Sequence, residues 1–151
     1  LGVRSLREVQ DDPLADVLAR LDDDVVRRCA RHVITENARV LETASLLRAG
    51  RVADIGPVLT AGHASMRDDF EITVPEVDVA VDTALAAEAL GARMTGGGFG
   101  GSVIALVPRD ATATVAAAVT AAFARHGFTA PNTFTTRPSR GAGRDDEGIT
   151  P

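Results

Sequence analysis

The sequence contains no lysine, a single cysteine and no long apolar run, and each of these absences excludes a class of function. All 16 basic residues are arginine, which excludes chemistry that needs a lysine, such as the phosphate-binding lysine of a Walker loop. The lone Cys29 excludes an internal disulfide and any cysteine-based zinc cluster, and its apolar helical position predicts a small buried side chain. No stretch approaches the roughly 20 apolar residues that cross a bilayer.

The 151 residues carry a net charge of −5, with 45% hydrophobic and 25% charged side chains, as is typical of a soluble globular domain. An acidic chain is poorly suited to coat nucleic acid, and no signal peptide is visible. We therefore expect a cytoplasmic protein with neither nucleic acid nor a membrane as its partner. Because the chain begins with Leu1 rather than methionine, we also expect it to be a fragment of a longer product.

Hydrophobic periodicity and capping signals predict a helical first half followed by strands. Helices are expected at a Ser5–Glu8 capping box, after the N-cap Asp12, from Asp24 to about Ala49, from about Asp54 to Phe70, from a Thr73–Glu76 capping box to Gly91, and from Ala111 to His126. Strands are expected at Ala92–Thr95, Ser102–Val107 and Thr133–Arg137. This order predicts the α+β class, an antiparallel sheet packed with helices. Residues 138–151 have almost no apolar side chains and are predicted to be a disordered tail.

Glycine is concentrated between the first two predicted strands, where five of the six residues Gly96–Gly101 are glycine. Each glycine in an ordered element costs roughly 0.5–1 kcal/mol relative to alanine. Such a run therefore indicates a backbone that approaches something closely: a phosphate, another loop or a packed neighbour. A flexible hairpin connection is the alternative, although hairpins need only one or two glycines.

Gly96, Gly98 and Gly101 match the pattern G-x-G-x-x-G, but two familiar meanings of that pattern fail. A dinucleotide-binding loop precedes a helix, whereas a strand is expected here. The protein-kinase loop lies in a hairpin but works with a lysine that holds the ATP phosphates. What remains is a loop whose N–H groups can form an anion-binding concavity, or a surface on which a second loop packs.

A second polar group lies at the end of the helix that is predicted to begin near Asp54. It consists of His63, Ser65, Arg67, Asp68 and Asp69. Arg67 beside a phosphate, or Asp68 as a metal ligand or base, is one interpretation; a solvated helix end with local salt bridges is the commoner one. Aspartates at a helix C-terminus are disfavoured by the helix dipole, which indicates a role other than helix stability. No spacing resembles a known metal site, so we expect no metal ligand in this chain.

The segment Gly91–Val107, GARMTGGGFGGSVIALV, resembles the third sequence motif of galactokinases, which belong to the GHMP small-molecule kinase superfamily. Other segments resemble the same family: Leu1–Val9, Arg31–Val40, Gly62–Phe70 and Pro75–Asp78. The resemblance extends to about Arg137. Phe99 and the flanking Ala92-Arg93-Met94 favour galactokinase within the superfamily, while Ser102 stands where the family often has cysteine.

This resemblance implies that residues 1–137 form a ferredoxin-like domain, the C-terminal half of a two-domain kinase. The family's sugar-binding, phosphate-binding and catalytic motifs lie in an N-terminal half and do not occur here. The intact protein would transfer the γ-phosphoryl group of ATP to the C1 hydroxyl of galactose, giving galactose 1-phosphate, with Mg²⁺ whose ligands lie mostly outside this chain. We therefore expect no catalytic residue in this chain and no activity from it alone.

The resemblance also implies which residues form the phosphate and nucleotide site. The loop consists of Gly96, Gly97, Gly98, Phe99, Gly100 and Gly101, supported by Thr95, His63, Arg67, Asp68 and Asp69. Galactose and ATP would bind together with the N-terminal half, and the face turned toward that half would be exposed here, which predicts self-association. Two alternatives stay open: a non-catalytic binding or regulatory module, and the C-terminal half of another GHMP sugar kinase, such as one acting on an arabinose-like or amino sugar.

Overall fold

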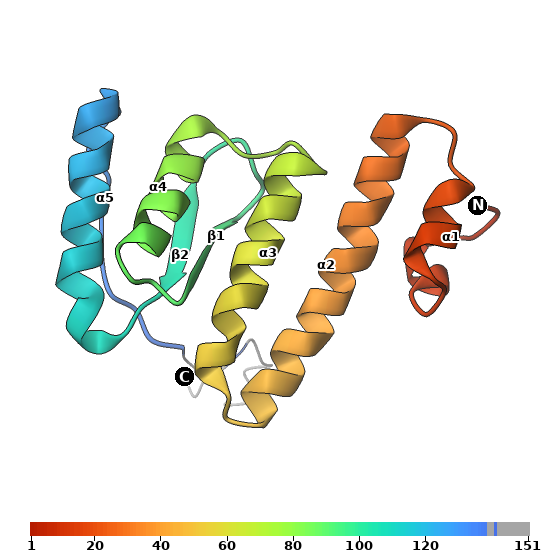
Figure 1. Ribbon diagram of the computed structural model, residues 1–151, viewed down its shortest axis with the longest axis horizontal. Coiled ribbons are helices and arrows are strands. Elements are labelled where there is room, and N and C mark those ends of the chain that lie inside the picture. The colour runs from red at the N-terminus through yellow and green to blue at the C-terminus, as the bar shows by residue number, and fades with distance from the viewer. Residues whose placement is uncertain (139–140, 142–151) are drawn as a thin grey trace, which may run out of the picture.

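The computed structural model describes residues 1–138 and 141, and it confirms the α+β class (Figure 1). Its helices are α1 (Leu14–Ala19), α2 (Asp24–Arg48), α3 (Ile55–Asp68), α4 (Pro75–Ala86) and α5 (Thr112–His126). Strands β1 (Gly91–Thr95) and β2 (Ser102–Leu106) pair antiparallel, with Met94 opposite Val103. Short 3-10 turns cover Leu6–Val9, Val52–Asp54 and Arg109–Ala111. Apart from Pro138 and Gly141, the predicted tail lies outside the described residues.

In Figure 1, α4 and α5 lie on one side of the hairpin, α3 lies next to β1, and α2 lies between α3 and α1. Three apolar clusters hold parts of this arrangement together. The first cluster joins α4, α5 and β1 and contains Val81, Ala84, Ala92 and Val115. The second joins α3, α4 and β1 and contains Met66, Val77 and Met94. The third, Val9, Val17 and Ile34, holds the N-terminal turn and α1 on α2. Each fully buried large apolar side chain contributes about 1.5–3 kcal/mol. The first two clusters each include a residue of β1, so this strand is packed between α3, α4 and α5.

The start of β1 packs main chain to main chain on α3. A Cβ on Gly56 would lie 2.0 Å from the carbonyl oxygen of Leu90, and a Cβ on Gly91 would lie 2.0 Å from the carbonyl oxygen of Gly56. Only glycine fits at either position. The prediction that Gly91 ends the preceding helix is therefore wrong, because α4 ends at Ala86 and Gly91 opens the strand.

Two predicted helix starts differ from the structure. α1 is capped by Pro13 rather than Asp12, a shift of one residue. α4 begins after Val74 without a capping bond from Thr73, because the Thr73 hydroxyl instead donates to the carboxylate of Asp78 at 3.2 Å. Other signals are confirmed: the Ser5 N–H donates to Glu8 at 3.1 Å, and α5 ends at Gly127 with a left-handed φ of 71°.

The strand predicted at Thr133–Arg137 is not formed, and these residues have no regular secondary structure. The side chain of Phe134 is 81% exposed, so no core contact anchors the segment. Strand propensity expresses side-chain packing on a sheet more than an intrinsic backbone preference. Without such packing, the β-branched residues of this segment do not make a strand.

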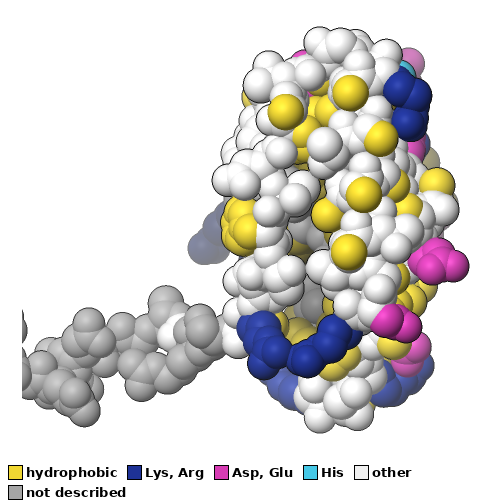
Figure 2. Space-filling view, turned by 90° about the vertical axis from the view of Figure 1, so that its left-hand side faces the viewer, with side chains coloured by type: hydrophobic (Ala, Val, Ile, Leu, Met, Phe, Trp, Pro, Cys, Tyr) yellow, Lys and Arg dark blue, Asp and Glu magenta, His cyan; other side chains and the backbone are white. Residues whose placement is uncertain are grey.

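The outer surface over α5 carries few charges. Viewed from that side, hydrophobic and uncharged atoms cover its middle, and basic side chains lie at its lower end (Figure 2). Alanines at four-residue spacing, Ala113, Ala117 and Ala121, are among the exposed residues of this helix.

Cys29 was predicted to be buried but is only half-buried, as a free thiol. In the part of the chain that the structure describes, no helix is long and apolar enough to span a membrane.

Candidate functional site

The loop Gly96–Gly101 joins β1 to β2 through backbone conformations that few residues adopt. The φ angles are 102° at Gly96, 90° at Gly98, 122° at Gly100 and 98° at Gly101. Residues with a Cβ are strained at such angles, whereas glycine is not. Phe99 is also left-handed, with a φ of 58°, and its side chain is 74% exposed. Four of the five glycines of this run are therefore required by conformation, and Gly97 is the exception.

One side of the loop is open. A Cβ on Gly96, Gly97 or Gly100 would meet nothing within 4 Å. Among the described residues, none accepts a main-chain hydrogen bond from the N–H of Gly96, Gly97, Gly98 or Gly100. Only the first part of the loop, Gly96–Gly98, alternates between positive and negative φ, the pattern in which successive N–H groups form an anion-binding concavity. The loop therefore has free space on one side and N–H groups that make no main-chain hydrogen bond to a described residue.

The other side of the loop is held by the connection between α3 and α4. The N–H of Phe99 donates to the carbonyl oxygen of Ile72 at 2.6 Å. A Cβ on Gly98 would lie 3.0 Å from the Cβ of Ile72, whose side chain packs on the Met66–Val77–Met94 cluster. Sequence reasoning missed Ile72, because an apolar residue carries no signal that its carbonyl holds a distant loop.

His63 lies beside the strand that leads into the loop, and its side chain is 2% exposed. Its Nδ1 accepts a hydrogen bond from the N–H of Met94 at 3.3 Å. Its Nε2 lies 3.2 Å from Oδ1 of Asp78, close enough for electrostatic attraction but not aligned as a hydrogen bond. Burial lowers the pKa of His63, and the charge of Asp78 opposes this only in part. Near neutral pH the imidazole is therefore neutral, and because Nδ1 accepts from Met94, its proton lies on Nε2.

Arg67 and Asp68 pair with each other at the surface. The Nε of Arg67 lies 2.8 Å from Oδ1 of Asp68, and this hydrogen bond lowers the pKa of the Asp68 carboxyl. The geometry is that of a solvated helix end with a local salt bridge. Thr95, the last residue of β1, is exposed at the entrance to the loop. Roles for these three residues beside a phosphate stay predictions.

Asp69 connects α3 to α2. Its carboxylate accepts hydrogen bonds from the hydroxyl of Ser65 at 3.1 Å and from Arg31 at 2.7 Å. The same hydroxyl lies 3.0 Å from Nδ1 of His32, whose ring stacks on Phe70 with centroids 4.6 Å apart. Because the Ser65 proton points to Asp69, His32 donates from Nδ1. These contacts explain why an aspartate is tolerated at a helix C-terminus.

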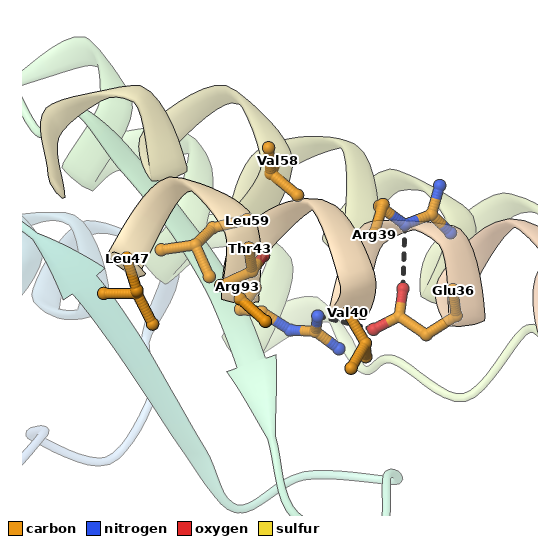
Figure 3. A pocket seen from close by; sticks show the side chains of 9 residues that line it. Glu36, Arg39, Val40, Thr43, Leu47, Val58, Leu59 and Arg93 are labelled. Atoms are coloured by element: carbon orange, nitrogen blue, oxygen red, sulfur yellow. Dashed lines mark hydrogen bonds and ion pairs between the residues drawn. The ribbon is translucent and has the colours of Figure 1, made fainter. Parts of the chain in front are cut away.

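A separate hollow of about 260 Å³ lies between α2, α3 and β1 (Figure 3). At its polar end the carboxylate of Glu36 accepts hydrogen bonds from Arg93 at 2.6 Å and from Arg39 at 2.8 Å. Burial raises the pKa of Glu36, but the hydrogen bonds and charges of the two arginines outweigh it, so the pKa is lowered. The remaining lining is mostly apolar: Val40, Thr43, Ala44, Leu47, Val58 and Leu59. No loop residue lines the hollow, so it is distinct from the loop.

The described residues contain no group of three or more His, Cys, Asp or Glu side chains arranged to hold a metal ion. Several of the carboxylates instead pair with arginines, as Asp68 does with Arg67, Asp69 with Arg31, and Glu36 with Arg39 and Arg93.

Residues 43–125 match the family described as GHMP kinases C terminal. The chain is 54% identical over 145 residues to a galactokinase of Streptomyces coelicolor, covering 95% of this chain and 38% of that protein. It is 49% identical over 142 residues to a galactokinase of Mycobacterium tuberculosis, covering 94% of this chain and 39% of that protein. The chain thus spans about two fifths of the length of these curated relatives.

A solved structure agrees with the sequence comparison. The galactokinase of Lactococcus lactis, crystallised with galactose, superposes with a TM-score of 0.79 at 36% identity, covering 87% of this chain and 34% of that one. Since the family match covers more than half of the chain and the fold is shared, this chain belongs to the GHMP kinase family and represents its C-terminal domain.

Proposed function

We propose that this chain is the C-terminal part of a galactokinase, which transfers the γ-phosphoryl group of ATP to the C1 hydroxyl of galactose. The observation that carries the proposal is the open, left-handed loop Gly96–Gly101 in a chain 54% identical to a galactokinase. Phosphoryl transfer depends on positioning and on charge stabilisation rather than on covalent chemistry by the protein. A loop that Ile72 holds on one side, with N–H groups that make no main-chain hydrogen bond to the residues described, fits that need.

In this proposal the loop forms one wall of the phosphoryl-transfer cleft. Its open side faces the phosphates, or the phosphate-binding loop of an N-terminal half, and its closed side rests on Ile72. Mg²⁺ would neutralise phosphate charge, and we assign it no ligand in the described part of this chain. Galactose and the catalytic residues are assigned to the N-terminal half, so residues 1–137 act as its C-terminal partner domain and the chain alone is inactive.

A charge placed on the open side of the loop tests this arrangement. A Cβ on Gly97 would meet no neighbour within 4 Å, so Gly97→Asp and the neutral, similarly sized Gly97→Asn should fold alike. In the full-length protein, Gly97→Asp should lower kcat/KM for ATP about tenfold or more by repelling the phosphates, and Gly97→Asn much less. Equal effects of the two variants would count against phosphates at this loop.

The substrate is tested with the full-length protein in an ADP-release assay with galactose, an arabinose-like sugar and an amino sugar. Galactose should be the preferred acceptor. Preference for another sugar would identify another GHMP sugar kinase, and binding without turnover would favour a regulatory module. The isolated chain should show no turnover, and light scattering tests whether it self-associates as we propose.

A further inference from the structure

The edge of β1 that faces α3 is completed by side chains instead of a third strand. The N–H of Met94 donates to Nδ1 of His63 at 3.3 Å. The carbonyl oxygen of Met94 accepts from Nε of Arg93 at 3.2 Å. Both main-chain groups of the residue two positions before the glycine loop are thus held by side chains, and one of them reaches across from a neighbouring helix.

The far side of the His63 ring faces α4. Its Nε2 lies 3.2 Å from Oδ1 of Asp78, and Oδ2 of Asp78 accepts from the hydroxyl of Thr73 at 3.2 Å. Thr73 follows Ile72, whose carbonyl oxygen binds the N–H of Phe99 in the loop. These contacts form a closed path around the base of the loop, from Met94 through His63 and α4 back to Phe99.

We propose that His63 is a positioning residue for the loop: its neutral imidazole, with a bare Nδ1 that accepts from Met94 and an Nε2 that faces Asp78, fixes the direction in which the chain leaves β1. The consequence for phosphoryl transfer rests on the proposed function, but the placement of the loop does not. The burial of the ring favours the neutral form that this role needs. The charged groups that face it are Arg67 from its own helix and Asp78 and Asp82 from α4.

The first test uses this chain unaltered. ¹⁵N spectra of the histidine rings at pH 7 should show His63 with an unprotonated Nδ1 and a protonated Nε2. The amide of Met94 should exchange with solvent more slowly than those of Gly96 and Gly97. A protonated Nδ1, or a Met94 amide that exchanges as fast as the loop, would overturn the proposal without any reference to kinase activity.

The second test separates positioning from stability in the full-length protein. His63→Leu removes the acceptor for Met94, whereas His63→Asn keeps an oxygen near the place of Nδ1. Val115→Ala loosens the α5 core and touches neither the loop nor His63. Small displacements of catalytic elements can cost up to about a hundredfold in rate. His63→Leu should therefore lower kcat about tenfold or more, with substantial rescue in His63→Asn.

The Val115→Ala control shows whether the loss of kcat in His63→Leu comes from a displaced loop or from lower stability. It should lower the melting temperature while keeping kcat near the wild-type value at a temperature where it is folded. If His63→Leu lowers kcat no more than this control does, or if His63→Asn gives no rescue, His63 acts through stability alone and the proposal is wrong. If the wild type has no galactokinase activity, the proposed function is wrong. The spectroscopic test of His63 and Met94 does not depend on that activity and would still apply.

Discussion

At the start of β1, Gly91 lies against Gly56 of α3 with no room for a Cβ, whereas at the end of the same strand one side of the loop Gly96–Gly101 faces open space. Gly91 and Gly56 do not have left-handed φ angles, but four of the loop glycines do. One end of the strand thus needs glycine because of a neighbour, and the other needs it because of backbone conformation. The main-chain contact with Gly56 fixes the N-terminal end of β1, which we call its base. The C-terminal end, which we call its exit, leads into a loop with free space for a ligand on one side.

The largest effect is expected from filling the contact at the base. Gly56→Ala or Gly91→Ala would bring a Cβ to 2.0 Å from main-chain atoms, which side-chain movement cannot relieve. We expect a loss of about 3 kcal/mol or more in the free energy of unfolding, measured by chemical denaturation of this chain.

Gly62→Ala is the matched control on the same helix. Its Cβ would meet mainly the end of the Arg93 side chain, at 2.8 Å, and that side chain can shift. The change should stay within about 1 kcal/mol, since alanine is also the better helix former. Equal losses at Gly56 and Gly62 would contradict the main-chain contact.

A smaller effect is expected within the loop, where two neighbouring glycines differ. Gly98 has a φ of 90° and a Cβ position 3.0 Å from Ile72, so Gly98→Ala should lose about 1–3 kcal/mol. Gly97 has open space and no left-handed φ, so Gly97→Ala should change stability by less than about 0.5 kcal/mol. Thermal and urea unfolding of both variants measure the difference; a costlier Gly97→Ala would show that the open side is covered.

We expect acid to destabilise the C-terminal end of β1, near Met94, before it destabilises the N-terminal end of the strand at Gly91. The pKa of His63 is lowered by burial from its usual 6.5, so the unfolded chain binds a proton more readily than the folded chain does. The stabilisation from the neutral imidazole is therefore present above about pH 6.5 and is lost as the pH falls through the folded-state pKa.

Amide exchange at several pH values checks this order. Relative to their unfolded rates, protection should fall at Met94 before it falls at Ala92, which lies beside the Gly56–Gly91 contact. His126→Asn, at an exposed position on α5, serves as the control and should leave this order unchanged. Simultaneous loss at both amides would mean that His63 does not hold the exit separately.

The smallest effect is expected at the surface pair that lies beside neither contact. Asp68→Asn removes the charge that Arg67 contacts at 2.8 Å, on side chains that are 61% and 40% exposed. Exposed pairs contribute little because water screens them, so stability should change by less than about 0.5 kcal/mol. A fall in the activity of the full-length protein without a change in unfolding would instead support a functional role for Asp68.

Sequence reasoning predicted the features that are encoded locally. The apolar spacing along α2 and the glycine after α5 gave those helices, because periodicity and a left-handed cap residue act within a few residues. The run Gly96–Gly101 indicated an unusual backbone for the same reason. The strand at Thr133–Arg137 was predicted wrongly, because its formation depends on a partner that local propensity does not reveal.

The candidate site was only partly accessible in this way. His63 stood out as a polar residue on an apolar helix, but its partners Met94 and Asp78 lie far along the chain and came together only through packing. Gly91 was interpreted as a helix end, since nothing local shows that it meets Gly56. Ile72 gave no signal, because its carbonyl oxygen rather than its side chain holds the loop.

The sequence by itself determined the helices, the hairpin and the need for left-handed backbone between its strands, because each follows from the conformational preferences of neighbouring residues. The tertiary structure alone decided which side of the loop is closed by Ile72 and which stays open, and which imidazole nitrogen binds Met94. Those outcomes depend on distances between residues that are remote in the chain, and such distances are set by the packing of α3 and α4 around β1.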